Sequence, residues 1–273
     1  MTVVWVNGAL VAEDTPSVSA LDHGLTVGDG VFETLKVANG QPFALRRHLD
    51  RLERSAAGLG LPLPDRRRVA DACGTVVARL DTDEIHRLRI TYTAGRGPLG
   101  SDRTDAEPTL TLAASPAPTW AAGAAVAMAP WPRNERSPLV GLKTTSYADN
   151  VVALAWARER GAGEAIFVNT AGRLCEGTGS NVFLVLDGEL VTPALRSGCL
   201  AGITRELVLE WTDATEADVP ADALETASEA FLTSSTRDVQ PIVAVDGRRL
   251  DAGPVTAQAA AEFARRSAID VDP

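Results

Sequence analysis

Lysine is scarce in this sequence. The 26 basic residues include lysine only at Lys36 and Lys143, so arginine supplies almost all of the positive charge. A coding bias toward arginine explains this scarcity in general, but it leaves open what the remaining lysines do. Arginine stays protonated and cannot form an imine, whereas a lysine amine can lose its proton and attack a carbonyl.

Other scarcities exclude whole classes of protein. The three cysteines, Cys73, Cys175 and Cys199, are odd in number and show no CxxC spacing. The sequence therefore predicts reduced thiols rather than a disulfide framework or a zinc site. No apolar run has the length of a transmembrane helix, and the N-terminus lacks a basic region followed by an apolar one. We therefore expect no membrane partner and a cytoplasmic location.

Charge and histidine content narrow the possible functions further. The net charge of −10 argues against nucleic acid or an anionic membrane as a partner, so an anionic small molecule would need a local positive pocket. His23, His48 and His86 stand in no recognisable pairing with a serine or cysteine motif, which disfavours a nucleophilic hydrolase. No cluster of ligands for a metal is visible either.

The length of 273 residues favours two domains. We expect an N-terminal α/β domain at 1–115, a proline-rich connection at 116–138 and a C-terminal domain at 139–273. Helices and strands are mixed without strict βαβ alternation, which predicts an α+β fold. The spacing of apolar residues predicts helices at 45–59, 67–80, 150–160, 204–211 and 255–266. Alternation and turn residues predict strands at 3–11, 87–92, 125–128, 164–169, 181–186, 189–192, 230–232 and 242–245.

Lys143 and Glu176 are the first candidates for chemistry. Lys143 lies among small hydroxyl residues before a predicted helix, and Glu176 lies in the glycine-rich bend CEGTGSNVF at 175–183. An isolated lysine or turn acid is usually exposed to water. In combination, however, the amine could bond a carbonyl and the acid could protonate a heteroaromatic nitrogen, with Ser180 and Asn181 offering neutral hydrogen bonds.

Further segments are suited to a phosphate. GITR at 202–205 opens a predicted helix, whose unpaired N–H groups attract anions, and TSST at 233–236 ends a predicted strand with consecutive hydroxyls. A helix cap and a polar turn explain these two segments equally well. Arg51, in HLDRL at 48–52, adds a guanidinium that is most simply a solvated charge.

The order of these segments, together with GDGVFET at 28–34, resembles the class IV aminotransferase family over nearly the whole chain. The resemblance implies the two-domain fold type IV of pyridoxal 5′-phosphate (PLP) enzymes, like D-amino acid aminotransferase, with PLP enclosed by the two domains of a homodimer. It implies that Lys143 is the catalytic Schiff-base lysine and Glu176 the partner of the pyridine nitrogen. It implies that the phosphate is held by Arg51, Ile203, Thr204, Ser234 and Ser235, the isoleucine acting through its N–H group.

Three functions remain open, two of them enzymatic. Thr34, which ends GDGVFET, favours a 4-amino-4-deoxychorismate lyase that releases pyruvate and 4-aminobenzoate for folate biosynthesis, because its hydroxyl could relay a proton to the departing group. The alternative is an aminotransferase acting on D-amino acids or branched-chain amino acids, although Phe32 replaces the tyrosine usual in the D-amino acid enzymes. A non-catalytic binding protein is disfavoured because Lys143 and Glu176 are intact.

Four residues are candidates for contact with the substrate. Arg89 and Arg96 are predicted to bind a carboxylate, since a guanidinium binds one bidentately, although surface solubility explains them equally well. Phe32 and Thr236 are also expected beside the substrate.

Overall fold

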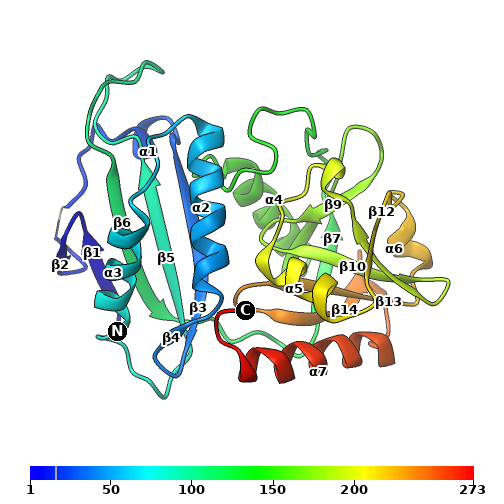
Figure 1. Ribbon diagram of the computed structural model, residues 1–273. Coiled ribbons are helices and arrows are strands. Elements are labelled where there is room, and N and C mark those ends of the chain that lie inside the picture. Colours follow the sequence, from blue (N-terminus) through cyan, green and yellow to red (C-terminus); the bar gives the residue numbers. More distant parts are fainter. Residues whose placement is uncertain (16) are drawn as a thin grey trace. The chain divides into compact units, whose positions relative to one another are not determined.

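The computed structural model of this chain describes residues 1–15 and 17–273 (Figure 1). Its contacts divide the chain into two compact units that interleave along the sequence. The first comprises Met1–Pro118, Leu142–Tyr147 and Asp270–Pro273, and the second comprises Thr119–Gly141 and Ala148–Ile269. Each unit has its own sheet and its own hydrophobic core.

The first unit contains an antiparallel sheet with the strand order β2-β1-β6-β5-β3-β4. Its strands are β1 (Val3–Val6), β2 (Ala9–Val11), β3 (Gly30–Ala38), β4 (Gln41–Pro42), β5 (His86–Thr93) and β6 (Thr109–Pro116). Its helices are α1 (His23–Thr26), α2 (Leu45–Leu59) and α3 (Arg66–Val77). The turn between β1 and β2 uses Asn7 and Gly8, both with positive φ, as a tight hairpin requires.

Helices α2 and α3 cover one face of this sheet (Figure 1). Leu52 of α2 and Val76 of α3 belong to the same buried cluster as Leu35, Leu88 and Ile90 from the strands. Burying each large side chain of this kind contributes about 1.5–3 kcal/mol. Because side chains alternate along a strand, the opposite face carries a different set. That set comprises Phe32, Thr34 and Lys36 of β3 and, paired with them, Thr91, Arg89 and Arg87 of β5.

The second unit contains a mixed sheet with the order β12-β11-β10-β13-β14-β7-β8-β9, and β15 pairs with β14. The strands are β7 (Ala124–Met128), β8 (Glu164–Val168), β9 (Leu174–Gly177), β10 (Asn181–Leu186), β11 (Glu189–Pro193), β12 (Thr215–Ala217), β13 (Glu229–Ser234), β14 (Asp238–Val245) and β15 (Arg248–Arg249). The helices are α4 (Ala148–Arg158), the 3-10 helix η1 (Leu195–Ser197), α5 (Ile203–Trp211), α6 (Ala223–Thr226) and α7 (Pro254–Ile269). Strand β9 ends the order but also contacts β10, so the sheet curls back toward itself.

The mixture of helices and strands confirms the expected α+β class. The predicted helix at 45–59 and the predicted hairpins at 3–11 and 181–192 are present. Strands β3 and β6 were not predicted from the sequence, although each has a neighbouring strand on both sides in the first sheet. None of the helices in the described ranges is long and apolar enough to cross a membrane.

The domain boundaries expected at 115 and 139 stay a prediction. The contacts group the chain differently at one point, because the short segment Leu142–Tyr147 belongs to the first unit. Its backbone pairs with the beginning of β3, where Val31 and Thr144 form an isolated bridge. Lys143 therefore lies in the first unit, although the segments before Leu142 and after Tyr147 belong to the second.

Candidate active site

The backbone around Lys143 is fixed on two sides in the first unit. The N–H of Phe32 donates to the carbonyl of Lys143 at 2.9 Å, and the N–H of Thr145 donates to the carbonyl of Gly30 at 2.8 Å. The N–H of Lys143 donates to the hydroxyl of Ser55, a buried residue of α2, at 3.1 Å. The start of the lysine side chain therefore has a defined position relative to β3 and α2.

The Lys143 amine lies in an aromatic and cationic environment. Its Nζ is 4.5 Å from the ring centroid of Phe32 and 6.0 Å from that of Tyr147. The two rings meet edge to face, with centroids 5.3 Å apart. The Cζ of Arg89 lies 3.6 Å from the centroid of the same Phe32 ring. The amine of Lys143 and the guanidinium of Arg89 thus lie against the same aromatic ring.

A buried carboxylate network lies on the helix-covered side of β3. Both oxygens of Glu33 accept hydrogen bonds from Arg51, with Nε at 2.8 Å and Nη2 at 2.6 Å. The Nδ1 of His48 is 2.6 Å from Oε2 of Glu33. Burial raises the pKa of Glu33, but the opposing effect of Arg51 and His48 is larger, so the pKa falls to about 2. Arg51 is thus no solvated surface charge, and burial lowers the pKa of His48 despite its carboxylate partner.

Replacing Glu33 with glutamine is expected to lower the free energy of unfolding at neutral pH by about 3 to 5 kcal/mol, because the buried Arg51 would lose its counter-charge. The folded-state pKa of Glu33 is lowered from 4.5 to about 2, so the stabilisation is complete above pH 4.5 and disappears as the pH falls to about 2. The difference in unfolding free energy between the wild type and the Glu33→Gln variant should therefore shrink as the pH falls from 4.5 to about 2. Urea denaturation at a series of pH values measures both effects.

The matched control is Glu262→Gln. Hydrogen bonds from Arg265 and Arg266 also hold the pKa of Glu262 at about 2, but this group lies at the surface of α7. Its replacement is expected to change stability little, because exposed ion pairs contribute little. An equal loss in the two variants would contradict the assignment of Glu33 as a buried charge partner.

Glu176 is held at the end of β9 in the second unit. Its Oε2 accepts a hydrogen bond from the N–H of Leu200 at 2.9 Å, and its Oε1 lies 3.5 Å from Nη2 of Arg133. The Arg133 guanidinium stacks on Phe167 at 4.2 Å and donates to Asn150 at 3.1 Å. Glu176 is therefore not a turn acid that faces water, because its carboxylate is largely buried and has two partners. Arg133 was not predicted as a site residue, because it carries no local signal within the proline-rich segment.

A buried ion pair organises the glycine-rich bend that follows Glu176. Glu164 of β8 accepts hydrogen bonds from the hydroxyl of Thr178 and, at 2.8 Å, from the N–H of Gly179. Glu164 also pairs with Arg237, whose guanidinium stacks on Trp120 at 3.8 Å. Because Arg237 directly follows the TSST segment, this pair ties the bend to the hydroxyl segment.

Several polar groups of the second unit fit a phosphate. Gly202 precedes α5, and no side chain in the described part of the chain caps this helix. Ile203 and Thr204 in the first turn are buried. Asn181 donates to the carbonyl of Leu200 at 2.9 Å, and a Cβ on Gly202 would lie 2.0 Å from its Oδ1, so only glycine fits there.

The hydroxyl segment lies at the end of β13. Ser234, Ser235 and Thr236 are partly buried. The hydroxyls of Ser180 and Thr233 are buried and have no hydrogen-bond partner among residues 1–15 and 17–273. Orphaned buried hydroxyls are costly, so they indicate a polar group that completes their hydrogen bonds. The uncapped N-terminus of α5 and the hydroxyl segment suit a phosphate, and Glu176 suits a ring nitrogen. Together these groups fit PLP.

Thr34, predicted as a catalytic residue, and Arg96, predicted as a substrate residue, both lie in the first unit. Arg96 is exposed on the loop after β5, and no contact places it beside Lys143. Thr34 is partly buried and shares its sheet face with Phe32 and Arg89. The described residues include no group of three or more histidine, cysteine, aspartate or glutamate side chains that could hold a metal ion.

Residues 30–245 match the family described as amino-transferase class IV. The chain belongs to this family. The putative branched-chain-amino-acid aminotransferase of Methanocaldococcus jannaschii is 33% identical over 90% of this chain and 88% of that protein. The bifunctional aminodeoxychorismate lyase / D-amino acid transaminase of Mycobacterium tuberculosis is 33% identical over 93% of this chain and 94% of that protein.

The fold of this class IV aminotransferase also matches that of solved structures. The branched-chain aminotransferase of Thermoproteus uzoniensis, solved with norvaline, is 33% identical, with a TM-score of 0.89 over 96% of this chain and 93% of that one. The predicted family and fold type IV are thus confirmed. Because the family consists of PLP-dependent enzymes, this chain is an enzyme that uses PLP.

Proposed function

We propose that this enzyme is an aminotransferase that moves the amino group of a branched-chain or D-amino acid to a 2-oxo acid. One observation carries the proposal: the Arg89 guanidinium and the Lys143 amine lie against the same Phe32 ring, at 3.6 Å and 4.5 Å from its centroid. A guanidinium binds a carboxylate bidentately, and an amine nearby can take a proton from the adjoining carbon. This pair therefore suits a substrate whose carboxylate is next to the carbon that reacts.

The proposed roles of the other residues follow from their chemistry. PLP, when bound, accepts the electrons that a carbon acid releases. Lys143 bonds the cofactor and later holds and moves the proton, while Glu176 keeps the ring nitrogen protonated. Ser180 and Asn181 add neutral hydrogen bonds. The phosphate is bound by Arg51, Ile203, Thr204, Ser234 and Ser235. Phe32, Arg89 and Thr236 contact the substrate.

A 4-amino-4-deoxychorismate lyase is the second candidate, and it was the reaction that the sequence favoured. Thr34 supports it, because this hydroxyl lies on the same sheet face as Phe32 and pairs in register with Arg89. The Mycobacterium tuberculosis relative is named for both activities. The aminotransferase is preferred because relatives named for that activity alone also cover most of this chain.

Incubating the holoenzyme with 2-oxoglutarate and either leucine or D-alanine is expected to form glutamate. The Arg89→Ala variant should raise KM about tenfold or more, since a lost hydrogen bond to a charged group costs about 1.5–3 kcal/mol. Arg87→Ala is the matched control, because Arg87 lies on the same face of the same strand and is also exposed. Its KM should stay near the wild-type value.

The same assay separates the two candidates. Release of pyruvate and 4-aminobenzoate from 4-amino-4-deoxychorismate without any added 2-oxo acid, together with no transfer from leucine or D-alanine, would replace the proposal with the lyase. Absence of both reactions would contradict both candidates.

We also propose a homodimer. Helix α4 exposes two adjacent valines, Val151 and Val152, with 63% and 54% of their surface accessible, and a second copy of the chain would cover exposed apolar side chains of this kind. Light scattering of the purified protein measures the oligomeric state.

A further inference from the structure

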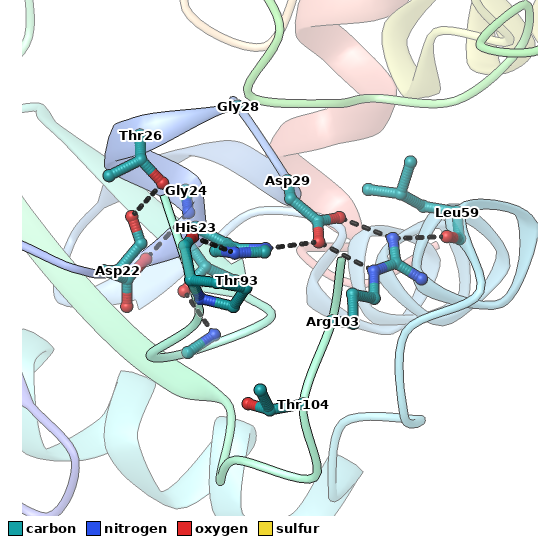
Figure 2. A network of polar contacts seen from close by, with 12 residues as sticks. Asp22, His23, Gly24, Thr26, Gly28, Asp29, Leu59, Thr93, Arg103 and Thr104 are labelled. Carbon is teal, nitrogen blue, oxygen red and sulfur yellow. Dashed lines mark hydrogen bonds and ion pairs between the residues drawn. The ribbon is translucent and has the colours of Figure 1, made fainter. Parts of the chain in front are cut away.

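A polar network centred on Asp29 lies in the first unit and includes none of the side chains assigned above (Figure 2). Both oxygens of Asp29 accept hydrogen bonds from Arg103, with Nε at 2.7 Å and Nη2 at 2.5 Å. The Nδ1 of His23 lies 3.4 Å from Oδ2 of the same carboxylate. Burial raises the pKa of Asp29, but hydrogen bonds and charge from Arg103, with a smaller contribution from His23, lower it overall. The carboxylate is therefore ionised at neutral pH.

Arg103 connects Asp29 to the end of α2. It donates to the carbonyl of Leu59 at 2.8 Å (Figure 2) and to that of Gly60 at 2.9 Å. A guanidinium with four such bonds is fixed far better than in an ordinary surface ion pair, even though 38% of its side chain is exposed. Asp29 is thus tied to the helix whose Ser55 hydroxyl accepts the Lys143 N–H.

His23 connects the same carboxylate to the loop after β5. Its Nε2 lies 3.0 Å from the carbonyl of Pro98, so this nitrogen donates. A Cβ on Gly97 would lie 2.2 Å from Nε2, so glycine is required for this close approach. The imidazole is buried beside the loop, and the backbone carbonyl of His23 accepts the N–H of Asp29 at 3.1 Å.

The backbone on either side of Asp29 supports the lysine segment directly. The carbonyl of Gly28 accepts hydrogen bonds from the hydroxyls of Thr145 at 2.9 Å and Ser146 at 3.0 Å. The carbonyl of Gly30 accepts the N–H of Thr145. Gly28 has a φ of +71°, and a Cβ there would lie 2.6 Å from the Ser146 hydroxyl. The Asp29 side chain is thus the anchor of a loop whose two flanking carbonyls hold the residues after Lys143.

We propose that Asp29 and Arg103, supported by His23, are positioning residues that fix the Lys143 amine for its chemistry. This inference rests on the proposed role of Lys143. Loss of the Asp29–Arg103 bond releases the 28–30 loop from α2. The segment Leu142–Tyr147, which carries Lys143, is then bonded to a loop that is no longer held in place. The amine still reaches the cofactor but holds a proton at the reacting carbon less accurately, so turnover falls while binding of the substrate persists.

The test compares Arg103→Ala and Asp29→Asn with the control Arg66→Ala. Arg66 is a matched residue because it also joins a carboxylate, Asp50 at 2.5 Å, to a backbone carbonyl, Arg46 at 3.3 Å, and its side chain is 40% exposed. Amide hydrogen exchange of Phe32 and Thr145, the two amides that join β3 to the lysine segment, is the first readout. Both should exchange about tenfold faster in the Asp29 and Arg103 variants, and at the wild-type rate in the control.

The second readout separates positioning from general destabilisation. In the holoenzyme assay, kcat should fall about tenfold or more in Arg103→Ala, since small displacements of a reacting group are costly, while KM changes less than about twofold. Arg103→Lys keeps the charge but not the bidentate geometry, so it should restore only part of kcat. Unchanged exchange at Phe32 and Thr145, or full rescue by lysine, would overturn the proposal.

Failure of the proposed function has a different signature. Borohydride treatment of the holoenzyme, followed by peptide mapping, reports whether Lys143 carries the cofactor in the wild type and in each variant. Absence of the label on Lys143 in the wild type would reject the role of Lys143. A labelled wild type whose exchange and kcat are unaffected by Arg103→Ala would reject only the positioning role.

Discussion

Replacing Lys143 with alanine is expected to remove the covalently bound cofactor and to lower kcat by about three orders of magnitude or more, since the amine both bonds PLP and moves the proton. Lys143 is half-buried and makes its backbone bonds through its own N–H and carbonyl, which alanine retains. The fold should therefore persist. The visible absorbance of the purified protein, its turnover and its urea denaturation curve together measure these outcomes.

Lys36→Arg is the control, because Lys36 is the other lysine of the chain. It lies on β3 with its Nζ 5.4 Å from the ring centroid of Phe43, and arginine preserves its charge. This variant should keep the colour and the turnover of the wild type. Turnover that survives in Lys143→Ala, or colour that is lost in Lys36→Arg, would reject the assignment.

Replacing Glu176 with alanine is expected to lower kcat by about 100-fold, an effect comparable to the loss of a positioned acid–base group. The cofactor's ring nitrogen would lose the carboxylate that keeps it protonated, and the Arg133 guanidinium 3.5 Å from that carboxylate would then disfavour protonation further. Steady-state kinetics of the cofactor-loaded protein measure the change in kcat.

Asp218→Asn is the control for Glu176. Asp218 also pairs with an arginine of the second unit, Arg196 at 2.8 Å, but both side chains are exposed. Its replacement should leave kcat unchanged, because no step of the proposed chemistry uses it. A Glu176 variant as active as this control would contradict the role proposed for the carboxylate.

Local signals in the sequence predicted much of the fold. Apolar residues at helical spacing, followed by Gly60 in a left-handed conformation, gave the bounds of α2 as they are observed. Asp187 and Gly188 both have positive φ, as the dipeptide in the predicted hairpin between β10 and β11 requires. Such features depend on residues close in sequence, so their physical cause is visible there.

Features that depend on distant residues were not predictable in the same way. Strand β3 contains Glu33, a buried charge that is tolerated only because Arg51 and His48 of α2 pair with it. The placement of Lys143 in the first unit depends on its backbone bond to Phe32, more than a hundred residues earlier in the chain. Strand formation depends on such partners more than on intrinsic preference.

In the candidate site, too, some residues could be predicted from local sequence and others could not. Lys143 and Glu176 could be nominated from residue type and motif, but Arg133 beside Glu176 and the Asp29–Arg103 pair could not. The sequence around an arginine does not indicate which carboxylate it will pair with. Its side chain is long and flexible, and its partner is defined only in the folded chain.

The most direct test of the central claim is to identify which side chain bonds the cofactor. Borohydride reduction of the holoprotein followed by proteolysis and mass spectrometry should find the reduced cofactor on the peptide that contains Lys143 and leave the peptide that contains Lys36 unmodified. A label on Lys36, or no labelled lysine in a protein that turns over its substrate, would contradict the account.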